Sequence, residues 1–442
     1  MALKLYNTLS RKKEVFKSIK KGEVGVYSCG PTVNGVPHLG HAKSTISFDL
    51  FRRYLEFLDY KVKFVSNITD IDDKIINKAN ELGISLDKLT KENTKLHLED
   101  YEKLNVLPPS KRTYATKFVK EMIELVSILE KKGYAYVIEH DGVYYDISKF
   151  KEYGKLSHQK IENLKAGARK KVNDNKKNPQ DFVLWKFSKP DEPKWNSPWG
   201  EGRPGWHIEC SAMIHSVLGV PFDIHGGGAD LIFPHHEDEI AQGEAAYDNY
   251  ANYWMHNGMV NVEGEKMSKS LGNFKTIRDL FSKYSPMVVR YFVVSGHYRK
   301  PVDFSEQALD DAKISYERLK RNSLDLRKSS KVNKKYIERF TEAMNDDLNT
   351  PQALAVLWEL VRDKDAKNKY GTIKKMDEVF GLNLLEVEKV EVFSEEIKSL
   401  AEERSKAREE KDWTRADIIR DKLLAKGYKV LDTKEGPKIE KV

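Results

Sequence analysis

The stretch Gly25-Val-Tyr-Ser-Cys29, followed by Gly30-Pro31 and then by His38-Leu-Gly-His41, decides the fold of this chain. The apolar run before Cys29 predicts a short strand, which Gly30-Pro31 ends. From His41 to Leu55 apolar residues recur at helical spacing, and Lys61–Asn67 predicts a second strand. A strand, a turn, a helix and another strand in this order predict the start of a nucleotide-binding α/β fold.

The segment 133–197 differs in character from what precedes it, and we expect an insertion that splits the nucleotide-binding domain. Tyr134–Ile138 and Gly142–Asp146 predict a β-hairpin. The basic, asparagine-rich stretch 168–178 is expected to be a mobile loop. The α/β pattern then resumes. From about Ser305 the chain is predicted to be helical and charged, and it ends in a second predicted hairpin.

The composition is that of a globular protein. The 442 residues are 40% hydrophobic and 33% charged, enough for about two to four domains. The net charge of +8 is modest, but it has the sign that a polyanionic partner requires. No apolar run approaches the ~20 residues of a membrane helix, and we find no apolar signal core, so we expect a cytoplasmic protein. The two cysteines, Cys29 and Cys210, are expected to be reduced.

Two distant segments contain residues that handle phosphates. His38 and His41 can direct imidazole N–H groups at phosphate oxygens, and Gly40 permits close approach of a nucleotide. Lys266-Met-Ser-Lys269-Ser270 lies between glycines, as in mobile segments whose lysines stabilise departing pyrophosphate. Each segment alone has a plainer interpretation, a structural histidine pair or a solvated basic loop. Together, about 225 residues apart, they resemble the two signatures of the class I aminoacyl-tRNA synthetases, which implies activation of an amino acid with ATP.

A candidate metal site consists of two cysteines, a histidine and a glutamate: Cys29, Cys210, His235 and Glu239. His235 and Glu239 are four residues apart in a predicted helix, so they share one face. These donors suit Zn²⁺, and because their spacing matches no zinc finger they must converge through the fold. His236 and Glu237 remain alternative ligands. The plainer alternative is two buried cysteines beside a capped, charged helix.

Four longer segments resemble the cysteinyl-tRNA synthetases closely: 27–33, 67–74, 205–213 and 224–242. The resemblance implies that the four candidate ligands hold one zinc ion per subunit, with the substrate's thiolate as a further ligand. It also implies an amino-acid pocket lined by Thr69, Trp206 and His225, although Trp206 by itself could equally be core packing. Asp230 is expected to bond the ATP ribose or a nearby polar group, and ATP to bring Mg²⁺.

Zinc in such a pocket would explain selection against serine, which differs from cysteine by one atom. Shape alone rejects such an analogue by only about 1–3 kcal/mol. A thiol with a pKa of about 8.5 ionises readily beside a metal, whereas an alcohol ionises less easily and is no soft donor. We therefore expect zinc to supply the discrimination. No editing domain is then needed, and the insertion looks too short for one.

Five residues depart from the usual pattern of that family: Asn34, Leu39, Lys43, Ala229 and Asp238. Leu39 replaces an isoleucine or valine, which is conservative. Asn34 stands where tyrosine is frequent, and Lys43 where arginine is frequent. None of the five removes a proposed ligand, but Lys43 is expected to weaken bidentate contacts at its position.

The same resemblance implies that the C-terminal part of the chain binds tRNA. It divides the sequence into a first catalytic half (1–132), a connective insertion (133–197), a second catalytic half with the zinc site (198–255), a stem-contact region with the lysine loop (256–315), a helical bundle (316–392) and an anticodon-binding domain (393–442). Arg408, Asp417 and Asp432 align with positions that read the anticodon, where they suit base edges as donor and acceptors. Trp413 is expected either to stack on a base or to anchor the core.

We therefore predict an α/β protein with a Rossmann-type catalytic domain split by an insertion, followed by a helical bundle and a small C-terminal domain. The expected reaction forms cysteinyl-adenylate from L-cysteine and ATP. It then transfers the cysteinyl group to the 3′-terminal adenosine of tRNA(Cys), first to the 2′-hydroxyl by class analogy. Family precedent suggests a monomer without a membrane partner. Two alternatives remain, a ligase that joins cysteine to an amino sugar, which needs no anticodon reader, and a non-catalytic RNA-binding paralogue.

Overall fold

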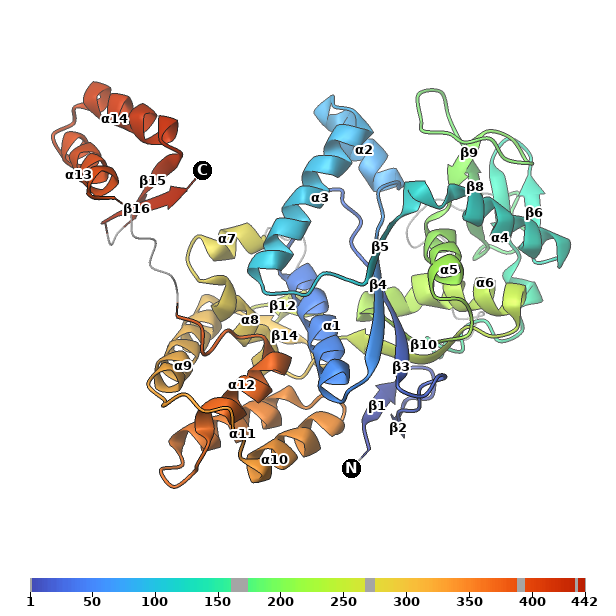
Figure 1. Cartoon of the computed structure of the whole chain (residues 1–442). Coiled ribbons are helices and arrows are strands. Elements are labelled where there is room, and N and C mark those ends of the chain that lie inside the picture. The colour runs from blue at the N-terminus through green and yellow to red at the C-terminus, as the bar shows by residue number, and fades with distance from the viewer. Residues whose placement is uncertain (1, 160–173, 267–274, 388–393, 434–435, 442) are drawn as a thin grey trace. The chain divides into compact units, whose positions relative to one another are not determined.

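The computed structural model describes residues 2–159, 174–266, 275–387, 394–433 and 436–441. The chain forms two compact units, Met1–Leu385 and Glu386–Val442, and each is described by itself (Figure 1). Most of the stretch predicted as a mobile loop lies outside the described residues. No helix in the described part of the chain is both long enough and apolar enough to cross a membrane.

A parallel five-stranded sheet forms the centre of the first unit. Its strands lie in the order β11-β10-β3-β4-β5, with these bounds: β3 Glu23–Ser28, β4 Lys61–Ile68, β5 Lys111–Tyr114, β10 Phe222–Gly228 and β11 Ala251–Asn257. After β3 the chain adds β4 and β5 on one side of the sheet, and after β10 it adds β11 on the other side, so the strand order reverses between β3 and β10. Ligands bind at such a reversal, beyond the carboxyl ends of the strands. The prediction of a Rossmann-type fold is confirmed.

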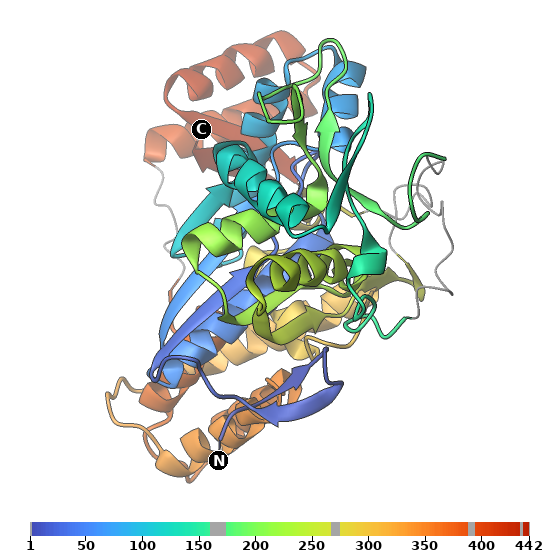
Figure 2. The ribbon, with the colours of Figure 1, turned by 90° about the vertical axis from the view of Figure 1, so that its right-hand side faces the viewer.

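Helices cover both faces of this sheet, with these bounds: α1 Leu39–Phe57, α2 Asp73–Leu82, α3 Leu86–Lys103, α5 Trp206–Val217 and α6 Glu237–Tyr247. Right-handed crossovers in opposite directions place α1 and α6 on opposite faces. In Figure 2, α5 and α6 lie on the viewer's side of the sheet. Helix α1 forms because Ile46, Leu50 and Tyr54, four residues apart, bury one stripe toward the helices that follow in sequence, where Tyr54 OH donates to Oδ1 of Asn345 at 2.7 Å. Gly226 of β10 admits Phe48 where a Cβ would collide.

The segment 133–197, predicted to be an insertion, and the residues that flank it build an antiparallel sheet on the flank of the first unit. Its strands lie in the order β6-β7-β8-β9 and α4 packs beside them, with these bounds: α4 Val119–Lys131, β6 Ala135–Ile138, β7 Gly142–Tyr145, β8 Phe182–Phe187 and β9 Gly202–Pro204. The predicted hairpin is the β6–β7 pair. Short turns of 3₁₀ or π type stand at Ala115–Lys117, Ile147–Lys149, Ala229–Leu231 and Ile232–His236.

The lysine motif begins in a small sheet, and the segment that begins at Lys275 lies beside the signature turn. The elements around it are β12 Val260–Val262, β13 Glu265–Lys266, α7 Ile277–Phe281, α8 Pro286–Ser295 and β14 Val302–Phe304. Residues 267–274 lie outside the described residues. After them, Leu39 N donates to Lys275 O at 3.2 Å and Ile277 N donates to Pro37 O at 3.0 Å. These bonds join Lys275 and Ile277, which follow the lysine motif in sequence, to the start of α1.

Four helices complete the first unit: α9 Glu306–Leu324, α10 Lys334–Asn345, α11 Thr350–Arg362 and α12 Lys369–Phe380. A single hydrophobic core joins them to α8 and α1, through Tyr54, Val289 and Phe340 among others. The N-terminal hairpin, β1 Lys4–Asn7 and β2 Lys12–Val15, packs at β11. The bundle is therefore continuous with the catalytic sheet.

The C-terminal unit is small and has its own core. It consists of α13 Glu395–Glu409, α14 Trp413–Ala425, β15 Tyr428–Thr433 and β16 Gly436–Lys441. The two strands are antiparallel, as the predicted terminal hairpin requires. Ile397, Ala401, Ile419 and Leu423 pack between the helices.

Candidate active site and metal centre

A cavity of about 920 Å³ opens where β3 and β10 end. Its wall contains residues from both sides of the sheet reversal and from the start of α1. Six predicted site residues line it: Cys29, His38, Gly40, His41, Trp206 and Asp230. Segments more than 200 residues apart in sequence therefore meet in one cavity. Asp230 is exposed at its rim.

The His-Leu-Gly-His turn begins α1 with a reciprocal cap. Nδ1 of His38 accepts a hydrogen bond from Gly40 N at 3.1 Å, and His38 N donates to Nδ1 of His41 at 3.2 Å. Because each Nδ1 accepts, the proton of each neutral ring lies on Nε2. The two rings stack with centroids 3.7 Å apart. The turn thus brings a helix N-terminus and two imidazoles to the cavity wall.

Lys43 follows this turn and is almost fully buried. Its Nζ donates to Met259 O at 3.3 Å and to Lys300 O. Burial lowers the pKa of Lys43 to about 8. Of the two catalytic lysines predicted from sequence, Lys266 ends β13, with its side chain outside the described part of the structure, and Lys269 lies wholly outside it.

The four candidate metal ligands converge beside the cavity. Sγ of Cys29, after β3, lies 3.8 Å from Sγ of Cys210 on α5 and 3.8 Å from Oε1 of Glu239 on α6. Nε2 of His235 lies 3.0 Å from the same Oε1. One donor atom from each of the four residues lies within 4.8 Å of every other. His235 and Glu239 lie side by side, but His235 belongs to the turn Ile232–His236 just before α6 and not to the helix itself.

These spacings fit a tetrahedral Zn²⁺ site. Two sulfurs each about 2.3 Å from one ion at a tetrahedral angle lie about 3.8 Å apart. That matches the Cys29–Cys210 distance of 3.8 Å, which is far too long for a disulfide, and both cysteines are free. Cys210, His235 and Glu239 are buried, whereas Cys29 lines the cavity. A donor set of two sulfurs, one imidazole and one carboxylate also suits zinc chemically.

The electrostatics of the cluster favour the metal-binding form of Cys210 and Glu239 and the protonated form of Cys29 and His235. Burial raises the pKa of Cys29, whereas hydrogen bonding with Cys29 lowers the pKa of Cys210 to about 6. Burial by itself would lower the pKa of His235, but Glu239 and Cys210 raise it to about 10. Burial would raise the pKa of Glu239, but His225 and His235 lower it. Cys210 is thus favoured as a thiolate and Glu239 as a carboxylate.

Of the two alternative ligands, Glu237 is already engaged elsewhere. Its carboxylate accepts hydrogen bonds from Gly154 N at 3.0 Å, Leu156 N at 3.3 Å and Ser157 N at 2.7 Å. His236 stays close to the cluster, with Nε2 3.3 Å from Sγ of Cys29. A second overlapping set of donors therefore exists: Cys29, His225, His236 and Glu239.

The three residues expected to bind the amino acid occupy different positions. Trp206 begins α5, lines the cavity and stacks on His235 with centroids 4.2 Å apart. His225 is fully buried, and its Nε2 lies 2.8 Å from Oε2 of Glu239. Thr69 is also buried, and its hydroxyl donates to Glu209 at 3.1 Å. Trp206 is therefore a wall of the cavity and is not simple core packing.

The sequence analysis missed residues that support the cluster. Tyr250 OH donates to Oε2 of Glu239 at 3.2 Å. Nδ1 of His236 lies 2.8 Å from Nε2 of His256. Asp238, noted as atypical, is buried and accepts from Tyr153 OH. No local signal marks Tyr250 or His256, because β11 and the segment before it reach the site only through sheet pairing.

The candidate anticodon residues belong to the C-terminal unit. The guanidinium of Arg408, on α13, lies 5.3 Å from the ring centroid of Trp413. Trp413 is 56% exposed, so it is not a core anchor. Asp417 on α14 is exposed and accepts from Arg420 at 2.7 Å. Asp432 lies on β15, with its side chain outside the described part of the structure.

Comparison with known families matches most of the chain. The sequence profile of the tRNA synthetases class I (C) catalytic domain matches residues 15–314, and that of the DALR domain matches residues 339–385. The chain is 48% identical over 454 residues to the cysteine–tRNA ligase of Vibrio parahaemolyticus, a match that covers 98% of each chain. It is also 48% identical over 450 residues to that of Pseudomonas putida, again over 98% of each.

Solved structures share the fold at low sequence identity. Mycobacterium tuberculosis methionyl-tRNA synthetase in complex with methionyl-adenylate matches with a TM-score of 0.58 and 16% identity, over 81% of this chain and 90% of that one. The LeuRS–tRNA–LeuAMS complex of Agrobacterium radiobacter K84 agnB2 matches with a TM-score of 0.61 and 11% identity, over 84% of each chain. The split catalytic domain followed by helices is therefore common to this chain and to both of these proteins.

Proposed function

The chain belongs to the cysteine–tRNA ligases of the class I synthetases, and from this premise we propose which of its residues carry each step. It is an ATP-dependent ligase that forms an aminoacyl-tRNA. The relatives match over 98% of this chain. An enzyme that joins cysteine to an amino sugar would need no anticodon reader, so this coverage disfavours that alternative.

The observation that carries the proposal is the convergence of four donors beside the signature turn: Cys29, Cys210, His235 and Glu239. We assign one Zn²⁺ to them. When bound there, the ion stabilises the thiolate form of the substrate cysteine. Cys29 lines the cavity, so the side chain of the amino acid reaches the centre from that side. Trp206 forms the adjoining wall, and Thr69 and His225 are assigned to the same pocket.

This arrangement separates cysteine from serine by donor chemistry. The donors are two sulfurs, a nitrogen and a carboxylate oxygen, which together suit a thiophilic ion. A pocket of the right shape alone would reject serine by only about 1–3 kcal/mol. A thiol ionises more readily than an alcohol and is the softer donor, so the metal adds a second criterion that serine fails. The ligase then needs no separate editing site.

Adenylate formation is assigned to the two signature segments. The neutral rings of His38 and His41 carry their protons on Nε2, which suits donation to phosphate oxygens that gain charge in the transition state. Gly40 admits the phosphates to the helix N-terminus. Lys266 and Lys269 are assigned to the departing pyrophosphate, and Mg²⁺ accompanies ATP. Asp230, exposed at the rim of the cavity, is assigned to the ribose.

The RNA partner is proposed to be tRNA(Cys). Residues 256–315 would support the acceptor stem, the bundle would lie along the tRNA, and the C-terminal domain would read the anticodon through Arg408, Asp417 and Asp432. The exposed ring of Trp413 supports this assignment, because bases stack on exposed aromatic rings. We propose a cytoplasmic monomer.

The test is ATP–pyrophosphate exchange with each of the twenty amino acids, together with the zinc content of the purified protein. We expect exchange with cysteine alone and about one zinc per chain. Removal of the zinc should abolish the preference for cysteine over serine. A zinc-free preparation that still prefers cysteine undiminished would refute the role of the metal. Exchange with a different amino acid would overturn the substrate, and no exchange at all would favour the RNA-binding paralogue.

A further inference from the structure

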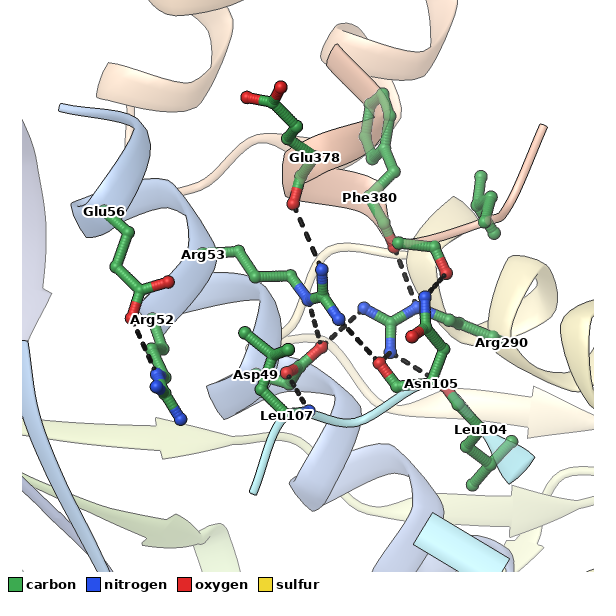
Figure 3. Close-up of polar contacts among 12 residues, drawn as sticks. Asp49, Arg52, Arg53, Glu56, Leu104, Asn105, Leu107, Arg290, Glu378 and Phe380 are labelled. Carbon is green, nitrogen blue, oxygen red and sulfur yellow. Dashed lines mark hydrogen bonds and ion pairs between the residues drawn. The ribbon is translucent and has the colours of Figure 1, made fainter. Parts of the chain in front are cut away.

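A buried arginine joins the catalytic domain to the helical bundle. Arg290 on α8 is fully buried, and each nitrogen of its guanidinium is used (Figure 3). Nη2 donates to Oδ2 of Asp49 on α1 at 2.6 Å, and Nε donates to Phe380 O at the end of α12 at 2.8 Å. Nη1 donates to Leu104 O at 2.9 Å and to Asn105 O at 3.1 Å, just after α3. Four segments thus meet at one side chain.

The partners of Arg290 are bonded to one another as well. Asp49 also accepts from Arg53 Nε at 2.8 Å and from Leu107 N at 2.8 Å. Arg53 Nη2 donates to Asn105 O at 2.7 Å and its Nη1 to Glu378 O at 3.3 Å. We call Asp49, Arg53, Asn105 and Arg290 the Arg290 node. Its two arginines and one aspartate bond the ends of α3 and α12 to the middle of α1.

The Arg290 node favours one arrangement of the helices that it connects. A buried guanidinium that loses a partner leaves an uncompensated charge, so the node tolerates little relative movement of α1, α8 and α12. Arginine presents its donors in a planar, rigid fork, which fixes direction as well as distance. The node therefore adds a directional constraint on α1 to the hydrophobic core that α1 shares with the bundle.

The position of α1 matters for catalysis because α1 begins at the signature turn. His41 and Asp49 lie eight residues apart on one continuous helix, and the rise of an α-helix makes this about 12 Å. Asp49 and Leu107 line the same cavity as His38 and His41. A displacement transmitted along α1 would thus move the histidines.

We propose that Arg290 is a positioning residue for adenylate formation. It sets the axial position of α1, and so the placement of His38 and His41 against the phosphates of ATP. The inference rests on the proposed role of these histidines. Because misplacement of catalytic groups by about 1 Å can cost about a hundredfold in rate, a small displacement of the guanidinium should lower kcat. KM for ATP and for cysteine should change little.

Two glycines offer a matched pair of variants. Gly381 and Gly83 both follow a helix in left-handed conformation, with φ of 62° and 64°. A Cβ at Gly381 would lie 2.6 Å from Nη2 of Arg290, whereas a Cβ at Gly83 would have nothing within 4 Å. Gly381→Ala and Gly83→Ala therefore introduce the same backbone strain, but only Gly381→Ala displaces the guanidinium.

The measurement is ATP–pyrophosphate exchange with cysteine, expressed per active site after titration of the adenylate formed. We expect kcat of Gly381→Ala to be at least about tenfold below that of Gly83→Ala, with both KM values within about twofold. Equal kcat values per active site in the two variants, even with a lower Tm for Gly381→Ala, would overturn the proposal. His41→Ala in the same assay tests the histidine separately, since full activity there would refute its catalytic role and not the node.

A second pair covers the case in which Gly381→Ala does not fold. Arg290→Lys keeps the positive charge but loses the planar guanidinium that donates in several fixed directions. Arg299→Lys is its control, because Arg299 Nε donates to buried Asp347 at 2.6 Å, and this pair contacts Tyr6, His297 and Tyr298, none of which belongs to α1. We expect a lower kcat per active site for Arg290→Lys alone. The same kcat in both lysine variants would refute the positioning role.

Discussion

The substitution Glu237→Gln should destabilise the protein without removing its metal. The carboxylate of Glu237 is fully buried, and its oxygens accept three backbone N–H groups, from Gly154, Leu156 and Ser157. Glutamine keeps one oxygen. If that oxygen stays on Gly154 and Leu156, the amide NH₂ faces the N–H of Ser157, which lies 2.7 Å from the carboxylate in the native protein. That bond is lost, and a buried donor is left without an acceptor.

The size of the effect follows from these contacts. A hydrogen bond to a charged group contributes about 1.5–3 kcal/mol, and an unsatisfied buried donor adds to the loss, so we expect about 3 kcal/mol. The first unit has 385 residues. At about 2.1 cal/mol/K per residue, the entropy of unfolding of that unit is about 0.8 kcal/mol/K, so Tm should fall by about 4 °C.

Scanning calorimetry and the zinc content of the same samples check this prediction. Glu239→Gln is the matched control, because it makes the same change two residues further along and removes a proposed ligand. We expect Glu237→Gln to retain about one zinc per chain and Glu239→Gln to lose it. Loss of zinc from Glu237→Gln with an unchanged Tm would show that Glu237, and not Glu239, binds the metal.

Two further predictions concern the pH dependence of stability and the RNA partner. Burial lowers the pKa of His97 to about 4 in the folded protein, whereas a histidine in the unfolded chain has a pKa of about 6.5. The unfolded state therefore binds a proton more readily, and the free energy of unfolding falls as the pH drops from about 6.5 to about 4. The loss amounts to at most about 3 kcal/mol. The Tm of the wild type should therefore fall more steeply between about pH 7 and about pH 5 than that of His97→Asn, and parallel curves would contradict the reasoning. Trp413→Ala should raise KM for tRNA about 5- to 100-fold, because a stacked base contributes about 1–3 kcal/mol, and should leave ATP–pyrophosphate exchange unchanged. Unaltered aminoacylation kinetics would exclude the ring of Trp413 from the RNA interface.

Much of the fold is predictable because its signals are local. The strand before Cys29, the helix after the signature turn and the strand at Lys61 each follow from periodicity within a few residues. Helix α1 begins at Leu39, two residues before the predicted start, because the side chain of His38 caps it. The hairpins are local for the same reason, since each strand pairs with its neighbour in sequence.

The candidate site is predictable only in part. Cys29, Cys210, His235 and Glu239 are suggested by residue type. Only the pair His235 and Glu239 is brought together by its spacing, because β3, α5 and α6 meet only through the sheet. His256 and Tyr250 have no signal at all. Residue types also could not show that Trp413 is exposed while Trp206 forms a cavity wall, because burial depends on what packs against each ring.

The local units of this protein and the residues able to perform its chemistry can be predicted from short segments, because hydrophobic period, caps and donor types are properties of such segments. Glu237 and Glu239 can be told apart only from the packing around them. Both lie on one helix, but one side chain faces the backbone of the insertion and the other faces two sulfurs. The same holds for Arg290 and Asp49, which are 241 residues apart. A buried charge is stable only where the fold supplies its partners, and those partners come from segments that meet when the sheet and the bundle pack.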